Sequence, residues 1–146
     1  MINYIVFITA TGEIVTNISM LEEALLDTVT ASVTAGRDYL AVAGNRNTQY
    51  VVTGVVTARP ALSVVATWSA TTIASGVTAT LGTTLPVETV VTVVASGAVQ
   101  LLGGRGHSVV FVNDGSFEFS STIPGTYTVS VECFPYLNTT YTITVT

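Results

Sequence analysis

Few residues of this chain could do chemistry, and the segment GGRGHS, from Gly103 to Ser108, is its only glycine-dense segment. A glycine-rich loop binds phosphate when it opens a helix and supplies a lysine at a fixed spacing. This segment lies between two expected strands, lacks that spacing, and belongs to a chain without lysine. We therefore predict a surface-exposed loop in which Arg105 and His107 are available to contact another chain.

Catalytic and metal-binding arrangements are also poorly represented. His107 is the only histidine and Cys133 the only cysteine, so the chain is short of zinc ligands. A Ser-His-Asp triad drawn from His107, Asp114 and a serine has no nucleophile elbow or similar local signature. The adjacent carboxylates Glu22 and Glu23 are explained by a solvated helix face. The sequence predicts a non-enzymatic protein with no catalytic residue, no metal and no cofactor.

Charge is scarce along the whole chain. Only 9% of the residues are charged, against 49% hydrophobic, and the formal net charge is −5. An ordinary soluble domain carries roughly 25% charged residues, so much of this surface must be Thr, Ser, Ala and Gly. The four arginines are scattered, which excludes a phosphate-neutralising patch for nucleic acid. Because neither a long apolar run nor a signal peptide is evident, we expect no membrane span and folding in the cytoplasm.

The first part of the chain predicts a β-rich arm with one short helix. Strand patterns at Tyr4–Thr9 and Ile14–Asn17 flank a turn at Gly12, which indicates a β-hairpin. A capping box and one apolar helical face then predict a helix over Ser19–Asp27. Three or four short strands follow, broken at 35–36, 44–45 and 53–54. The Arg59-Pro60 pair ends this run, because proline cannot donate to a sheet, so we place a boundary between regions 1–60 and 61–146.

The second region predicts an antiparallel β-sandwich, because many short strands are separated by turns and no helices intervene. The NDG sequence at Asn113–Gly115 indicates a hairpin turn, after which Phe117 and Phe119 face one side. Tyr127 stands early in its strand, as in the tyrosine corner of immunoglobulin-like domains, and Cys133 continues its alternating row as a buried thiol. The expected strands are Ser63–Trp68, Thr72–Ala74, Val77–Leu81, Thr89–Ala95, Val99–Leu102, His107–Val112, Ser116–Ser120, Thr126–Cys133 and Thr139–Val145.

Some aromatic residues do not fall at obvious core positions, namely Tyr4, Tyr39, Tyr50, Trp68 and Tyr136. Such rings could form a sugar-stacking face, and packing at strand ends or at a subunit interface explains them at least as well. The residues that we single out as a candidate interaction surface are Arg59, Arg105, His107, Trp68 and Tyr136.

Three segments in order, YIVFITATGEIV, QYVVTGVVTARPAL and VNDGSFEFSSTIPGTYTVSVECFPYL, resemble small virion proteins of tailed bacteriophages. Those proteins open with a hairpin, continue to a second hairpin ending in Arg-Pro, and finish in an immunoglobulin-like module. The matching positions are Tyr4, Gly12, Ile14, Tyr50, Gly54, Arg59, Pro60, Gly115, Pro124, Gly125, Tyr127 and Phe134–Leu137.

The resemblance implies a virion structural protein whose N-terminal region anchors it to other virion proteins and whose immunoglobulin-like domain is displayed. It also implies a homo-oligomer, of which a trimer is a common form on phage particles. Tail or tail-fibre association and capsid decoration remain separate alternatives within this hypothesis. A carbohydrate-binding or host-adhesion module that binds a host-surface glycan is the alternative from another class.

Overall fold

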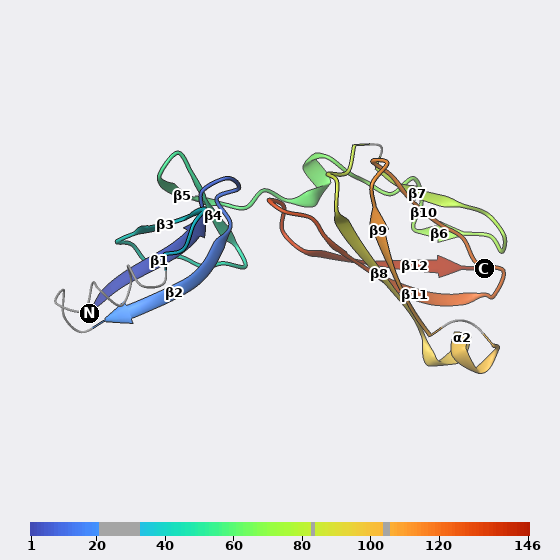
Figure 1. Ribbon diagram of the computed structural model, residues 1–146. Helices are drawn as coiled ribbons and strands as arrows, with labels where there is room; N and C mark the ends of the chain where they lie inside the picture. Colours follow the sequence, from blue (N-terminus) through green and yellow to red (C-terminus); the bar gives the residue numbers. More distant parts are fainter. Residues whose placement is uncertain (21–32, 83, 104–105) are drawn as a thin grey trace. The chain divides into compact units, whose positions relative to one another are not determined.

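The computed structural model describes residues 1–20, 33–82, 84–103 and 106–146, and it divides into two compact units, Met1–Pro60 and Ala61–Thr146 (Figure 1). They are called unit 1 and unit 2. Both are built mainly from antiparallel β-sheet, so the predicted mainly-β fold class is confirmed. Within the described ranges, no helix is long and apolar enough to cross a membrane.

Among its described residues, unit 1 holds two small sheets, and every strand pairing in them is antiparallel. The first sheet has the order β2-β1-β3, and the second pairs β4 with β5. The strands are β1 (Ile2–Ile8), β2 (Ile14–Met20), β3 (Arg37–Leu40), β4 (Gln49–Val52) and β5 (Val55–Ala58). The predicted first hairpin and the predicted strand breaks at 44–45 and 53–54 are therefore confirmed, whereas most of the strand predicted before 35–36 lies outside the described residues.

The turn between β1 and β2 packs against β4 through Gly12. This glycine has a φ of +77°, and its carbonyl accepts a hydrogen bond from the Val51 amide at 2.8 Å. A Cβ at Gly12 would overlap the Val51 carbonyl oxygen, so only glycine fits both the backbone angle and the close approach. The core of unit 1 lies beside this contact and consists of Ile5, Phe7, Ile14 and Val51, with Leu40 and Val56 packed against it.

The predicted helix over Ser19–Asp27 is wrong at its start. Ser19 and Met20 are the last residues of β2 and pair in register with the beginning of β1. The Ser19 hydroxyl donates to Oδ1 of Asn3 at 2.8 Å, so it is engaged across the sheet instead of capping a helix. Strand pairing overrides the local capping signal at this point. The rest of the predicted helix falls in 21–32, outside the described residues.

Unit 2 has two sheets that share one hydrophobic core, an arrangement consistent with the predicted sandwich. The larger sheet has the order β6-β12-β11-β8-β9 and is antiparallel except for the β6–β12 pair, and the smaller sheet pairs β10 with β7. The strands are β6 (Thr72–Ile73), β7 (Ala79–Leu81), β8 (Thr89–Ala95), β9 (His107–Val112), β10 (Phe117–Phe119), β11 (Gly125–Glu132) and β12 (Thr139–Val145).

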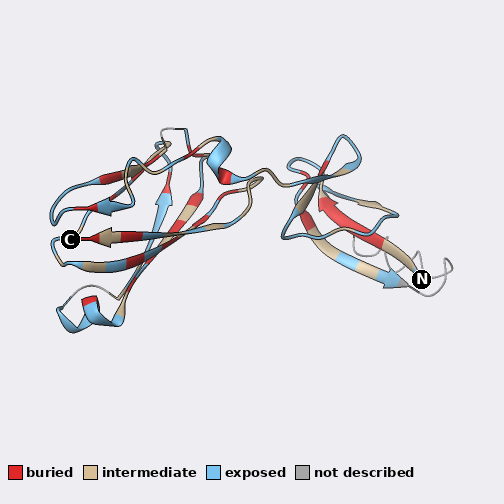
Figure 2. Ribbon diagram, turned by 180° about the vertical axis from the view of Figure 1, so that it is seen from behind, coloured by how far each residue is buried: buried red, intermediate tan, exposed pale blue. Residues whose placement is uncertain are grey.

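The core of unit 2 comes from alternate residues on the facing strands (Figure 2). Every second residue of β11 from Tyr127 to Val131 is buried, and the residues between them are exposed or half-buried. Phe117 and Phe119 are buried from the side of β10, as their spacing predicts. Cys133 is buried, which confirms the sequence prediction.

The predicted strand Ser63–Trp68 is wrong, because this segment begins in a 3-10 helix, Leu62–Val64. Leu62 is the buried residue of this helix, and its carbonyl accepts a hydrogen bond from the Ala66 amide at 3.0 Å. Trp68 pairs with Leu81 through an isolated bridge. The apolar residues here are anchored by one helical turn, which a strand pattern cannot reveal.

The predicted strand Val99–Leu102 is wrong as well, because most of it belongs to the helix α2 (Gly97–Leu101). Val99 is fully buried in the space that the missing side chain of Gly125 leaves open. Val99 alone holds this segment to the core, whereas a strand would bury every second residue. A short apolar run in the sequence does not distinguish a short helix from a strand.

The hairpin predicted across Asn113–Gly115 is also wrong, because the strands on its two sides lie in different sheets. β9 pairs with β8, whereas β10 pairs with β7. The carbonyl of Gly115 accepts from the Leu85 amide at 2.8 Å, which holds the crossing chain against the connection between β7 and β8. Alternation in the sequence identifies the buried face of β10 but does not identify its neighbour.

A buried tyrosine ties the start of β11 to the preceding loop. The Tyr127 hydroxyl donates to the Ile123 carbonyl at 2.8 Å and lies 2.6 Å from Oγ of Ser121. The Ile123 amide in turn donates to that Ser121 oxygen at 3.1 Å. This is the backward hydrogen bond of a tyrosine corner, at the residue where the sequence suggests one.

We expect Tyr127→Phe to lower the free energy of unfolding of unit 2 by about 1–3 kcal/mol, because it leaves buried polar partners unsatisfied. Urea unfolding followed by Trp68 fluorescence measures this loss. Tyr141→Phe is the matched control, since no hydrogen bond of its hydroxyl is found among the described residues. Equal stability of the two variants would show that the Tyr127 hydroxyl does not hold the loop.

In unit 1, Gly12→Ala is expected to lower stability by about 3 kcal/mol or more, through steric overlap with Val51 added to an unfavourable φ. Gly54→Ala, at a φ of +78° with open space around it, carries the backbone cost alone, about 1 kcal/mol. Hydrogen exchange in peptides covering β1 and β4 reports on this unit separately. Similar losses for both variants would contradict the close approach of the turn to β4.

Candidate functional site

The structure assigns different roles to the residues that we singled out from the sequence. Arg59 belongs to unit 1, where its Nη1 donates to the Asn47 carbonyl at 3.3 Å and its amide donates to the Thr48 carbonyl at 2.8 Å. These bonds hold the two ends of the β4–β5 hairpin together. Arg105 lies outside the described residues. His107 is exposed and is the first residue of β9.

The two candidate aromatic residues pack on the core of unit 2. The Trp68 ring makes edge contacts with Phe117 and Tyr141, each at a centroid distance of 6.0 Å. Burial raises the pKa of the Tyr141 phenol above its usual value. Tyr136 is half-buried, and its ring also packs against the core. An exposed stacking platform made of these rings is therefore not supported.

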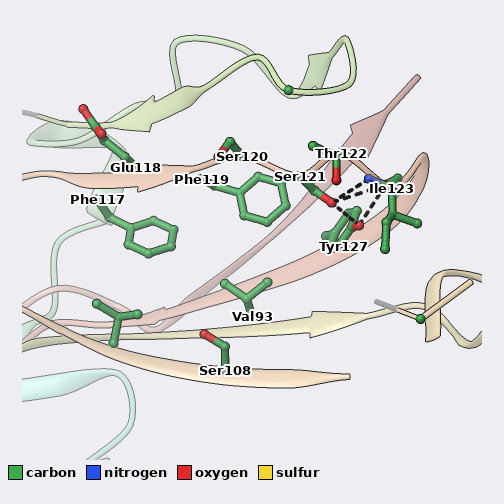
Figure 3. Close-up of a pocket in the computed structure, with 13 residues that line it drawn as sticks. Val93, Ser108, Phe117, Glu118, Phe119, Ser120, Ser121, Thr122, Ile123 and Tyr127 are labelled. Carbon is green, nitrogen blue, oxygen red and sulfur yellow. Dashed lines mark hydrogen bonds between the residues drawn. The ribbon is translucent and has the colours of Figure 1, made fainter. Parts of the chain in front are cut away.

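The feature that the sequence analysis missed is a groove on the side of unit 2 where both sheets end. It has a volume of about 650 Å³ and lies between β9 and β10. Figure 3 shows the rings of Phe117 and Phe119 directed from β10 toward Val93 and Ser108. Among the residues that line this groove, Glu118 alone carries a formal charge.

Next to the groove, β9 presents an apolar strand to solvent. Val109 is 47% exposed, Val110 38% and Phe111 66%. The strand contains no Asp, Glu, Lys or Arg, and the neighbouring outer positions of β8 are Val90, Thr92 and Val94. We call residues His107–Val112 the β9 edge.

The hydrogen bonds of β8 determine which backbone groups of β9 are engaged. Ala95 donates to the Gly106 carbonyl at 3.1 Å on the side of β9, and Ser96 donates to the Thr126 carbonyl at 2.9 Å on the side of β11. Both bonds continue the registers of the two ladders by one residue. Bonding alternates along antiparallel strands, so the odd-numbered residues of β8 bond to β9 and the even-numbered ones to β11.

The same alternation applies along β9. Ser108 and Val110 stand opposite odd-numbered residues of β8 and direct their N–H and C=O groups toward it. His107, Val109 and Phe111 direct theirs away from the sheet. In the described part of the chain, no strand pairs with that side of β9.

Unit 1 also exposes apolar side chains, around the tip of the β4–β5 hairpin. Val42 is 39% exposed, Val52 39% and Val55 61%, and a hollow of about 350 Å³ lies among Val42, Val55 and their neighbours. The hairpin from residue 49 to residue 58 carries no charged side chain. We call Val42, Val52 and Val55 the valine surface.

A metal site needs several ligating side chains close together. No group of three or more His, Cys, Asp or Glu side chains is found, in the part of the chain that the structure describes, in a position to share a metal ion. The arrangement can instead bind extended backbone along the β9 edge and apolar side chains in the adjoining groove.

We expect Trp68→Ala to destabilise unit 2 by about 2–4 kcal/mol, because it removes the ring that joins Phe117 and Tyr141. Val64→Ala is the control for an exposed residue nearby and should change stability by less than about 0.5 kcal/mol. Thermal and urea unfolding measure both changes. A Trp68→Ala variant that keeps its stability would show that the ring is not needed for packing, and would support a ligand-stacking role for it.

No protein-family model matches this chain, and a comparison with curated proteins finds no significant relative.

Proposed function

We propose that this chain is a non-enzymatic structural protein of a tailed-bacteriophage virion. In this proposal, unit 1 anchors the chain to other virion proteins, and unit 2 is an immunoglobulin-like domain displayed on the particle. The observation that carries the proposal is that each unit presents uncharged, valine-rich strands to its surroundings. The ordered sequence resemblance described above supports the choice of a virion.

The physical basis of anchoring is burial of apolar surface without opposing charges. Each Å² of apolar surface removed from water contributes roughly 25 cal/mol, so the valine surface gains from contact with any complementary apolar patch. No charged side chain of the β4–β5 hairpin must be desolvated or paired when it does so. A protein held in a dense lattice of neighbours benefits from such a surface.

The immunoglobulin-like assignment of unit 2 has its own support. Two sheets enclose one core, and Tyr127 closes a tyrosine corner onto the Ile123 carbonyl. The alternative of a glycan-binding module is not favoured, because Trp68 and Tyr136 are packed against the core.

The experiment is immunogold labelling of purified particles with an antibody against this chain, combined with its copy number from quantitative mass spectrometry. We expect label on the particle. Many copies over the head would indicate capsid decoration, and few copies at the tail would indicate a tail or fibre component. A complete lack of label on particles from infected cells that produce the chain would overturn the proposal.

The anchoring role of unit 1 is tested on the same particles with Val55→Lys, which places a charge in the valine surface. We expect fewer copies per particle than for the wild type. Val87→Lys, at a residue of unit 2 that is 71% exposed, is the matched control and should be incorporated normally. Equal incorporation of both variants would show that the valine surface is not the anchor.

A further inference from the structure

We propose that the β9 edge pairs with the β9 edge of a second copy of this chain, antiparallel and centred on Val109. The pairing would join two five-stranded sheets into one continuous sheet. This inference goes beyond the proposed function, in which unit 1 anchors the chain, and it assigns a partner to the β9 edge of unit 2.

The backbone of β9 is arranged symmetrically for this contact. Its outward-directed groups belong to His107, Val109 and Phe111, which are evenly spaced about Val109. A two-fold axis at Val109 therefore places His107 opposite Phe111 of the second copy, and Val109 opposite itself. Facing residues of this kind exchange both of their hydrogen bonds, so the two strands gain about six.

The side chains on the outer face fit the same register. Val109 would meet Val109 of the second copy, and the Phe111 ring would lie beside the imidazole of His107. Aromatic and β-branched cross-strand pairs are the ones that stabilise antiparallel sheets. The contact would cover Phe111 and Val109, which are among the exposed hydrophobic residues of unit 2.

The side chains of β9 that face the groove also fit this register. Ser108 and Val110 have their side chains on the face of β9 that lines the groove. In the two-fold register, Val110 of the second copy stands opposite Ser108, on the face of the sheet that lines the groove. Each copy thus contributes a valine to the open side of its neighbour's sandwich.

Charge does not oppose a second copy as the occupant. Like charges placed directly opposite each other destabilise strand pairs. When two identical strands pair, a charged residue near the two-fold axis lies close to the same charge on the second copy. The β9 edge has no formally charged residue, so the pairing incurs no such repulsion.

The two edge strands of the larger sheet differ in length and protection, and this difference supports pairing of the β9 edge. Free edges are usually protected by shortness, charged side chains, proline or bulges. The opposite end of the same sheet, β6, is only two residues long. The β9 edge has six residues in unbroken register and none of those protections.

Val109→Pro tests the pairing most specifically. Proline removes the N–H that points outward at the two-fold axis, and it leaves the bonds of Ser108 and Val110 to β8 in place. Because both copies lose a central hydrogen bond, we expect the dimer dissociation constant to rise roughly 10- to 100-fold. Sedimentation equilibrium of the full chain over a range of concentrations measures it. Circular dichroism and thermal unfolding verify the fold of the variant.

Val109→Lys is the second variant, used if proline disturbs the sheet, and Val87→Lys is its control of equal charge. We expect a wild-type dimer, a monomeric Val109→Lys variant and a dimeric Val87→Lys variant. A wild-type chain that stays monomeric at high concentration would overturn the proposal, and so would dimers that both β9 variants leave unchanged.

The register is tested by Val109→Cys with a short bis-maleimide. Two-fold pairing at this residue predicts efficient cross-linking into dimers, whereas Val87→Cys should not cross-link. The native Cys133 thiol is buried and should not compete. Dimers that fail to cross-link through position 109 would exclude this register. A virion-associated protein that proves monomeric by these assays would refute the pairing and leave the proposed function standing.

Discussion

The antiparallel register of β8 is the constraint on which the rest of unit 2 depends. Its odd-numbered residues bond to β9, and its even-numbered residues bond to β11. The odd-numbered side chains Val91, Val93 and Ala95 are also the buried ones. One alternation along a single strand therefore determines what enters the core and which backbone groups of β9 are left at the surface. Since a shift by one residue would expose the core valines, this register is strongly specified.

Low charge and an open sandwich side are complementary properties. A protein that stays dispersed usually protects its strand edges with charges, whereas one that functions among closely packed neighbours benefits from edges that attract. The β9 edge and the valine surface carry no formal charge, and both expose valine side chains. The groove beside β9 adds the aromatic walls of Phe117 and Phe119 to the backbone donors and acceptors, which is the combination used in strand addition.

Strands with strong local signals could be predicted from the sequence, and their partners could not. The β-branched runs at β8, β9 and β12 have the bounds that their alternation predicts. The helix α2 could not be recognised, because its one buried anchor, Val99, depends on the space above a distant Gly125. The pairing of β10 with β7 and the open side of β9 are tertiary facts that no local pattern encodes. Only the missing charges of HSVVFV hinted that this edge differs from an ordinary solvent-facing strand.

Amide hydrogen exchange along β9, resolved residue by residue by NMR, shows which amides of this strand are hydrogen-bonded in the free chain. In dilute protein we expect slow exchange at Ser108 and Val110, whose amides bond to β8, and fast exchange at His107, Val109 and Phe111. Raising the protein concentration should slow the second set and leave the first unchanged. Uniform protection of β9 in dilute protein, or fast exchange at Val109 that does not respond to concentration, would contradict an unpaired edge that is completed by a second copy.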